Sequence, residues 1–185
     1  WELSELNLLV RDVTQAMESY DVLGATRPIG DFVDNISNWY VRLNRKRFWG
    51  GEYDNDKIAA YQTLYMCLET VSRLAAPIAP FCMDQLFRDL NMTTGTSGED
   101  SVHLAPFPGY NETLINSDLE ERMAIAQNVS SMILGLRRKV SIKVRQPLAR
   151  IMVPVTEKGF REKFEAVRDL VLTEVNVKDV EYIDD

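Results

Sequence analysis

Apolar residues recur every three or four positions along the first half of the chain, which is the spacing of helices with one buried face. The first stripe covers residues 3–20, and we expect its helix to end at Gly24 and Pro28. The second stripe covers residues 29–43 and predicts a helix that reaches about Arg47 and stops at the glycine pair that follows. Two amphipathic helices therefore open the chain.

A third apolar stripe covers residues 58–75 and predicts a long helix. Asp54 or Asp56 supplies its N-cap, a side-chain oxygen that accepts a hydrogen bond from a free amide of the first turn. Two prolines follow this stripe and interrupt the pattern, because proline lacks the backbone donor that a helix interior uses. We expect a shorter helix to resume over residues 81–90.

Residues 91–116 are rich in Gly, Pro, Thr and Asn and predict a long loop. Ser117 and Glu120 then have the spacing of a capping box, in which a hydroxyl and a carboxylate satisfy free amides at a helix start. The apolar stripe of this helix runs to Val140. It is the last long helix that the pattern predicts.

The hydrophobic period changes after this helix. Residues 150–155 are β-branched and extended, residues 157–173 have a helical pattern, and residues 175–183 alternate like a strand. The chain is therefore predicted to be mainly α, with a helical bundle over residues 1–140 and a small α/β unit over residues 141–185.

The net charge is −7, from 28 acidic and 21 basic residues, and taken alone it argues against a nucleic-acid partner. The distribution of charge points the other way. Residues 35–51 contain four basic residues and no acid, and residues 122–156 contain seven basic residues and no acid. Chance clustering on solvated helix faces stays an alternative, but two basic patches on an acidic body favour binding to phosphate.

The first basic window places one tryptophan beside two arginines. Stepping 100° per residue along a helix brings Asn38, Arg42, Arg45 and Trp49 onto one face, opposite the apolar stripe. Guanidinium groups pair with phosphates and an indole stacks on an unpaired base, so this combination suits single-stranded or looped RNA. The alternative is that Trp49 folds back onto the bundle while the arginines pair with neighbouring acids.

The second basic window ends a helix, where cations also complement the helix dipole. Lys143 and Arg145 alternate with apolar residues, so in an extended segment both would leave the same face and follow a phosphate backbone. The two windows give these candidate RNA-binding residues: Asn38, Arg42, Arg45, Lys46, Arg47, Trp49, Arg137, Arg138, Lys139, Lys143 and Arg145.

Motifs of catalysis and metal binding are missing. One histidine, His103, and two cysteines, Cys67 and Cys82, are too few and too far apart for a zinc site, and we expect both cysteines to be reduced. There is no glycine-rich phosphate loop, Rossmann fingerprint or nucleophile elbow.

No apolar run approaches the ~18 residues of a membrane span and no signal peptide opens the chain, so we expect a cytoplasmic protein. A start at Trp1 suggests a piece of a longer chain.

Four segments carry a resemblance that covers nearly the whole chain: NISNWYVRLNRKRFWGG, LETVSRLAAPIAPF, VHLAPFP and LRRKVSIKVRQPLARI. In this order they resemble the anticodon-binding region of class I aminoacyl-tRNA synthetases, and most closely that of the isoleucyl enzymes. The resemblance implies a helical bundle that grips the anticodon arm, followed by a small α/β extension. The implied partners are an isoleucine-accepting tRNA and the catalytic domain of the same polypeptide, with neither DNA nor a membrane.

The family's HIGH and KMSKS motifs, which bind ATP and activate the amino acid, do not occur in this chain, and RRKVSIK does not match KMSKS. The resemblance therefore implies a tRNA-recognising part of a ligase, without catalytic residues or cofactors of its own. ATP and Mg²⁺ would belong to a catalytic domain elsewhere in the parent enzyme. The same region of a valyl-tRNA synthetase and a helical protein-interaction module are the alternatives.

Overall fold

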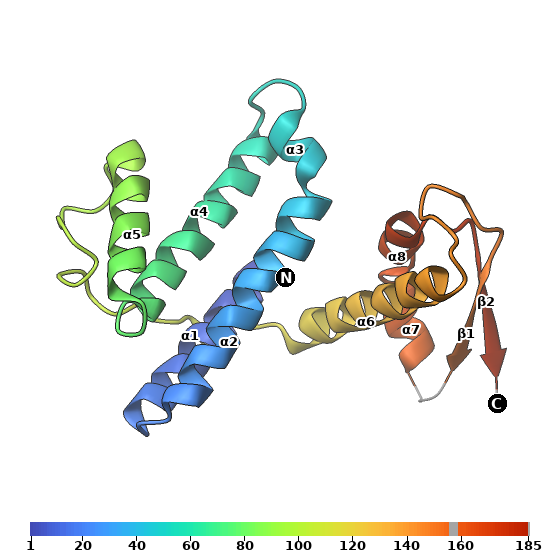
Figure 1. The fold of residues 1–185 in the computed structure, drawn as a ribbon, viewed down its shortest axis with the longest axis horizontal. Helices are drawn as coiled ribbons and strands as arrows, with labels where there is room; N and C mark the ends of the chain where they lie inside the picture. The colour runs from blue at the N-terminus through green and yellow to red at the C-terminus, as the bar shows by residue number, and fades with distance from the viewer. Residues whose placement is uncertain (156–158, 185) are drawn as a thin grey trace. The chain divides into compact units, whose positions relative to one another are not determined.

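The computed structural model describes residues 1–155 and 159–184. These residues form two compact units: the bundle unit, Glu2–Ile115, and the C-terminal unit, which takes the chain from Asn116 onward together with Trp1. Figure 1 shows a set of helices in the first and one long helix beside a small α/β layer in the second. The predicted fold class, mainly α with a small α/β unit at the end, is confirmed.

The bundle unit consists of α1 (Glu2–Glu18), α2 (Val22–Asn35), the π-helix η1 (Ile36–Val41), α3 (Arg45–Trp49), α4 (Asn55–Ala75), α5 (Pro80–Thr94) and the 3₁₀ turn η2 (Glu112–Leu114). Helices α1, α2 and α4 share one core, in which Val13, Cys67 and Leu74 are fully buried. Helix α5 packs against α4. Its Phe87 lies in a second apolar cluster with Val102 of the following loop.

The first helix ends earlier than predicted, and Gly24 and Pro28 do not end it. The chain turns at Tyr20, which has a left-handed φ of 59°. Asp21 then begins α2, because its Oδ1 accepts a hydrogen bond from the Gly24 amide at 2.8 Å. A Cβ at position 24 would collide with this carboxylate. Gly24 therefore leaves room for the Asp21 cap at the start of α2 and does not end α1. Pro28 lies within α2, where it removes one backbone hydrogen bond without ending the helix.

The second predicted helix is broken into three pieces. Its stripe runs through α2 into η1, whose wider π turns shift the register of the side chains. Asn44 follows with φ −91° and ψ 10°, outside the helical region, and its side-chain amide and backbone N–H both donate to the Tyr40 carbonyl oxygen, at 2.8 and 3.1 Å. The prediction of one helix to Arg47 is therefore wrong. The predicted stop at the glycine pair is confirmed, since Gly50 ends α3.

Two further helix boundaries were predicted well and one was not. Asp54 caps α4 by accepting a hydrogen bond from the Lys57 amide at 2.8 Å, and Pro80 occupies the first turn of α5 after the interruption. Before α6, however, the cap is Asn116, whose Oδ1 accepts from the amide three residues later at 3.1 Å. Ser117 is the first residue inside that helix, so the capping box is wrong by one position.

The C-terminal unit consists of α6 (Ser117–Lys139), β1 (Ile151–Val155), α7 (Phe160–Glu165), α8 (Arg168–Val175) and β2 (Val180–Asp184). The two strands pair in parallel, with Ile151 opposite Val180. Helices α7 and α8 both pack against α6, and Phe164, Val171 and Val175 are fully buried.

Two predictions for this part of the chain differ from the structure. Because α6 packs on α7 and α8, the compact units divide between residues 115 and 116, whereas the sequence placed a boundary after residue 140. The helix predicted over residues 157–173 is two short helices where it is described, and residues 157–158 lie outside the described part. The last strand begins at Val180 rather than at Val175, which is the buried last residue of α8.

Candidate nucleic-acid interface

Trp49 is an exposed indole at the end of α3. It is 73% exposed, as the helical projection predicts, and the guanidinium carbon of Arg45 lies 5.8 Å from the centroid of its ring. This distance is within the range of a cation–π contact. One side chain thus presents a flat apolar surface with a positive charge beside it.

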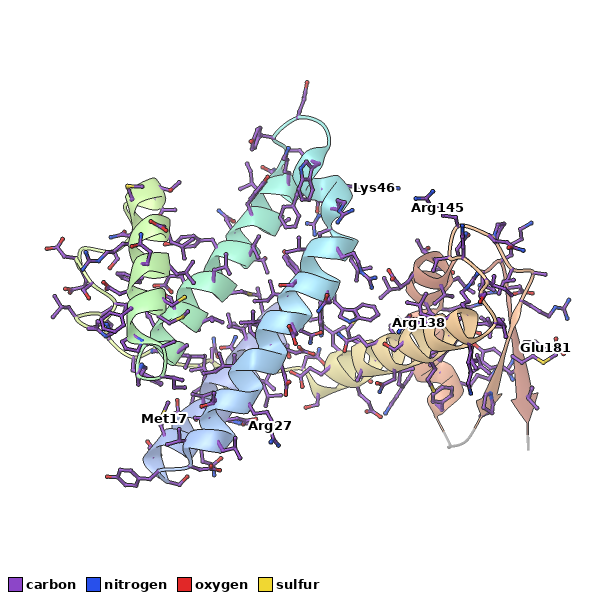
Figure 2. All side chains as sticks on the ribbon, viewed as in Figure 1. Met17, Arg27, Lys46, Arg138, Arg145 and Glu181 are labelled. Carbon is purple, nitrogen blue, oxygen red and sulfur yellow. The ribbon has the colours of Figure 1, made fainter. Side chains whose placement is uncertain are left out.

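The neighbouring residues of the first basic window are also exposed. Asn38, Arg42 and Lys46 all have exposed side chains, and Lys46 is labelled in Figure 2. Arg42 lies 5.1 Å from the ring centroid of Trp39, a residue that the sequence analysis did not single out. The signal for this pair was the spacing of three residues, which places neighbours on one side of a helix.

Phe48 explains why Trp49 points outward. Its buried ring packs edge-on against Tyr61 at 5.1 Å and against Tyr40 at 6.2 Å between centroids. The Tyr61 hydroxyl donates to the Phe48 carbonyl oxygen at 3.2 Å, and the Tyr40 hydroxyl donates to the carbonyl oxygen of Ala60 at 3.0 Å. Since consecutive helix residues point about 100° apart, fixing Phe48 inward directs Trp49 to solvent.

Arg47 is held by the fold and does not offer its guanidinium to a ligand. Its Nε and NH2 groups donate to the two carboxylate oxygens of Asp56 at 2.7 and 2.6 Å, and NH1 donates to Asn44 Oδ1 at 2.7 Å. The hydrogen bond to Asp56 raises the pKa of Arg47. We therefore remove Arg47 from the candidate RNA-binding residues, because its donors already tie α3 to α4.

Arg137 is also wrong as a candidate RNA-binding residue, because it is 3% exposed. Its NH1 group donates to the carbonyl oxygens of Lys143 and Gln146 at 3.1 and 3.0 Å, and NH2 donates to that of Asn176 at 3.0 Å. This side chain joins the end of α6 to the following connection and to the end of α8. Its role is to hold the C-terminal unit together.

The segment around Lys143 and Arg145 is a turn, and the prediction of an extended segment is wrong. The Gln146 amide donates to the Lys143 carbonyl oxygen at 3.0 Å, and the side chain of Asn176 donates to the Val144 carbonyl oxygen at 2.8 Å. The first bond closes a turn over residues 143–146, and the second joins this turn to the end of α8. The exposed basic residues of this window are Arg138, Lys139, Lys143, Arg145 and Arg150. Arg150 pairs with Glu181 at 2.8 Å, and Arg138 and Arg145 are labelled in Figure 2.

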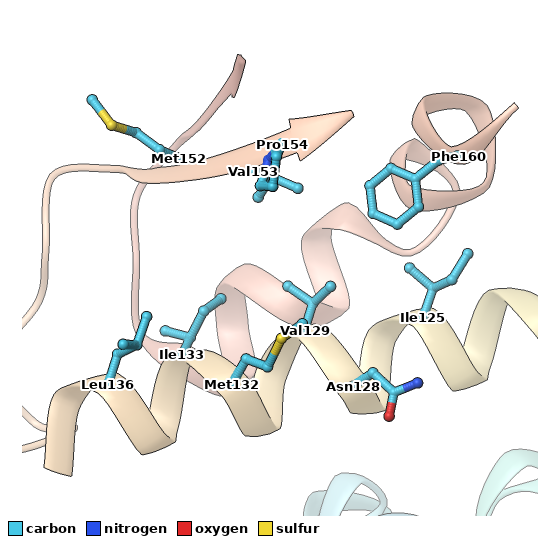
Figure 3. Close-up of a pocket in the computed structure, with 10 residues that line it drawn as sticks. All are labelled: Ile125, Asn128, Val129, Met132, Ile133, Leu136, Met152, Val153, Pro154 and Phe160. Atoms are coloured by element: carbon cyan, nitrogen blue, oxygen red, sulfur yellow. The ribbon is translucent and has the colours of Figure 1, made fainter. Parts of the chain in front are cut away.

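An apolar groove of about 440 Å³ lies between α6, β1 and the start of α7. Figure 3 shows Val129, Ile133 and Leu136 of α6 on the side of the helix that faces the strand, and Ile125 facing Phe160. The other residues that line it are Asn128, Met132, Met152, Val153, Pro154 and Phe160. None of the described residues that line the groove has a charged side chain, so these residues do not suit a phosphate backbone.

The remaining candidate chemistry is structural. Both cysteines are free, as expected, and burial raises the pKa of the Cys67 thiol to about 12, which keeps it protonated at neutral pH. His103 is exposed on a loop. Over residues 1–155 and 159–184, no three His, Cys, Asp or Glu side chains are grouped to hold a metal ion. In the same residues, no helix combines the length and apolarity of a membrane span.

Comparison with known proteins gives one consistent family. Residues 1–153 match the family model of the anticodon-binding domain of tRNA ligase. The chain is 56% identical over 185 residues, its full length, to the isoleucine–tRNA ligase of Bacteroides thetaiotaomicron and covers 16% of that protein. It is 46% identical over 178 residues, 96% of its length, to the enzyme of Dehalococcoides mccartyi and covers 18% of it. For Clostridium acetobutylicum the identity is 41% over 182 residues, 98% of the chain and 17% of the ligase. The chain spans less than a fifth of these relatives, and it belongs to the family of anticodon-binding domains of tRNA ligases.

Proposed function

We propose that this chain is the part of an isoleucine–tRNA ligase that binds the anticodon arm of isoleucine tRNA. The observation that carries the proposal is the exposed indole of Trp49 with Arg45 beside its ring. Looped RNA offers unpaired bases that stack on aromatic side chains, and its phosphates pair with guanidinium groups. The similarity to isoleucine–tRNA ligases over the full length of the chain supports isoleucine as the amino acid.

The residues that face the RNA in this proposal come from both basic windows. Trp49 stacks on an unpaired base and Asn38 offers an amide to a base edge or sugar. The basic side chains contact phosphates, which fix the position of the RNA. These are Arg42, Arg45 and Lys46 in the bundle unit and Arg138, Lys139, Lys143 and Arg145 in the C-terminal unit.

The ligase reaction itself, the joining of isoleucine to tRNA with ATP, is assigned to parts of the longer protein outside this chain. The proposal is supported by two observations: the sequence has no glycine-rich phosphate loop, and among residues 1–155 and 159–184 no three His, Cys, Asp or Glu side chains are grouped to hold a metal ion. The contribution of this chain is binding of tRNA, in the same polypeptide as the catalytic domain. We place the enzyme in the cytoplasm, where translation uses charged tRNA.

Replacing Trp49 with alanine tests the central observation. Because the side chain is exposed, we expect the free energy of unfolding to change by no more than ~0.5 kcal/mol. Loss of one stacked base should weaken tRNA binding by ~1 to 3 kcal/mol. A denaturant melt gives the first value, and titration of an isoleucine-tRNA transcript gives the second.

Trp49→Phe is the matched control, since it keeps an aromatic face and should retain most of the binding. A transcript with a changed anticodon loop should bind more weakly to the wild-type protein and respond less to Trp49→Ala. If the melt collapses while the folded fraction of Trp49→Ala binds as before, Trp49 is structural and the assignment of α3 to RNA is wrong.

Contacts to phosphates predict a strong dependence of binding on salt. The logarithm of the association constant should fall against the logarithm of salt concentration by about 0.7 to 0.9 per neutralised phosphate, so four contacts give a slope of roughly −3. Arg45→Glu and Arg138→Glu should each make the slope shallower and weaken binding. Arg11→Glu, the same change on α1 outside both windows, should have little effect. A slope near zero for the wild type would favour a protein-interaction module instead.

A further inference from the structure

The connection between α3 and α4 carries a second exposed aromatic ring. Tyr53 is 76% exposed and lies four residues after Trp49, which is 73% exposed. Gly51, between them, has a left-handed φ of 62°, a conformation that side chains with a Cβ rarely adopt. The backbone therefore turns sharply between two rings that both face solvent.

The backbone around Tyr53 is held in place although its ring is exposed. Lys57 is 7% exposed, and its ammonium group donates to the Gly50 carbonyl oxygen at 3.1 Å. The same ammonium lies 4.3 Å from the centroid of the Tyr53 ring, a cation–π contact. One cation thus fixes the end of α3 and one face of Tyr53, and Asp54 caps α4 immediately afterwards.

We propose that Tyr53 is a second base-stacking site, so that Trp49 and Tyr53 receive two unpaired bases of the same RNA loop. The inference rests on the proposed function and adds a residue that the basic windows did not contain. The two positions are four residues apart, so their Cα atoms lie within about 14 Å of one another. Both rings are backed by a cation, Arg45 for Trp49 and Lys57 for Tyr53.

The charges of the connection agree with a base as the ligand of Tyr53. Asp54 and Asp56 are occupied by the α4 cap and by Arg47. Glu52 is exposed beside Tyr53 and would repel a phosphate there. The RNA backbone would therefore pass on the side of Arg45, with a base reaching toward Tyr53. A stacking platform tolerates this arrangement because the contact is made by the face of the base.

The test compares Tyr53→Ala with Tyr53→Phe and Trp49→Ala. The probe is an anticodon stem-loop of isoleucine tRNA with 2-aminopurine at single loop positions, whose fluorescence changes on stacking. Tyr53→Ala should weaken binding by about 5- to 150-fold, as expected for one stacked base. Tyr53→Phe should bind like the wild type. Tyr53→Ala should abolish the fluorescence change at one loop position, and Trp49→Ala should abolish it at another.

Two controls separate stacking from other effects. Glu52→Gln, a change in the same turn without loss of a ring, should bind as tightly as the wild type or more tightly. A hairpin with the same stem and a closed, fully stacked loop offers no unpaired base. Its affinity should therefore be the same for the wild-type protein, Tyr53→Ala and Trp49→Ala. A thermal melt of each variant excludes unfolding as the cause.

The outcomes distinguish this inference from the proposed function. If Trp49→Ala weakens binding and Tyr53→Ala does not, Tyr53 is no stacking site while the proposed function stands. If Tyr53→Leu binds as well as Tyr53→Phe, the contact is apolar and the stacking assignment is overturned. If the wild-type protein does not bind the stem-loop, both proposals fail.

Discussion

Replacing Arg137 with methionine should destabilise the C-terminal unit by about 3 to 5 kcal/mol, because three carbonyl oxygens lose their donors. Methionine keeps an unbranched apolar stem but removes the guanidinium donors. The carbonyl oxygens of Lys143, Gln146 and Asn176 then lose a buried donor, and each unsatisfied group costs ~1 to 3 kcal/mol. Hydrogen exchange should show faster exchange of amides in the turn before Pro147 and at the end of α8.

The neighbouring residue provides the matched control. Arg138 is exposed on the same helix end, so Arg138→Met should change stability by no more than ~0.5 kcal/mol while weakening tRNA binding. Arg137→Lys should be intermediate, because one ammonium group cannot reproduce the planar fork that reaches three acceptors. If Arg137→Met and Arg138→Met lower stability equally, Arg137 does not hold the unit together and our interpretation of its hydrogen bonds is wrong.

Arg137 and Arg138 also show what the sequence could not decide. Both occur in one acid-free run, so composition assigns them the same role. The helical period does carry a signal, because Arg137 follows the fully buried Ser130 by seven residues and so lies on the same face. Because long basic side chains are rarely buried, Arg137 was predicted to be exposed in spite of its position on the buried face. The acceptors that make burial possible belong to other elements, which no local pattern identifies.

The candidate site on α3 was easier to predict for one ring than for the other. The helical period placed Trp49 opposite an apolar stripe, and its indole is exposed although the predicted helix is interrupted before α3. Tyr53 lies outside any helix, in a turn whose geometry depends on Gly51 and on the buried ammonium of Lys57. Patterns of three or four residues do not describe such turns. The ion pair between Arg47 and Asp56 could not be predicted from the sequence either, because it joins α3 to α4 across that turn.

Glu2 is the first residue of α1, and its carboxylate is buried. It is 3% exposed, and among the described residues neither of its carboxylate oxygens has a hydrogen-bond partner. Burial, and then the negative charge of Glu5, raise its pKa from 4.5 to about 8. The negative charge of an ionised Glu2 also acts on Cys67 and Tyr40, because it contributes to the raised pKa values of that thiol and that phenol.

Replacing Glu2 with glutamine should therefore stabilise the bundle unit at neutral pH. The raised pKa means that the folded state holds the proton more tightly than the unfolded state. The wild-type protein accordingly keeps its full stability below pH 4.5 and loses stability as the pH rises toward 8. The loss reaches about 3 kcal/mol near pH 7.

Glutamine has no proton to lose, so Glu2→Gln should remove this dependence of stability on pH. Denaturant melts from pH 4.5 to 8 measure it, with Glu18→Gln at the exposed end of α1 as the control. An equally steep slope in Glu2→Gln would show that another group causes the loss, and no slope in the wild type would show that Glu2 is solvated.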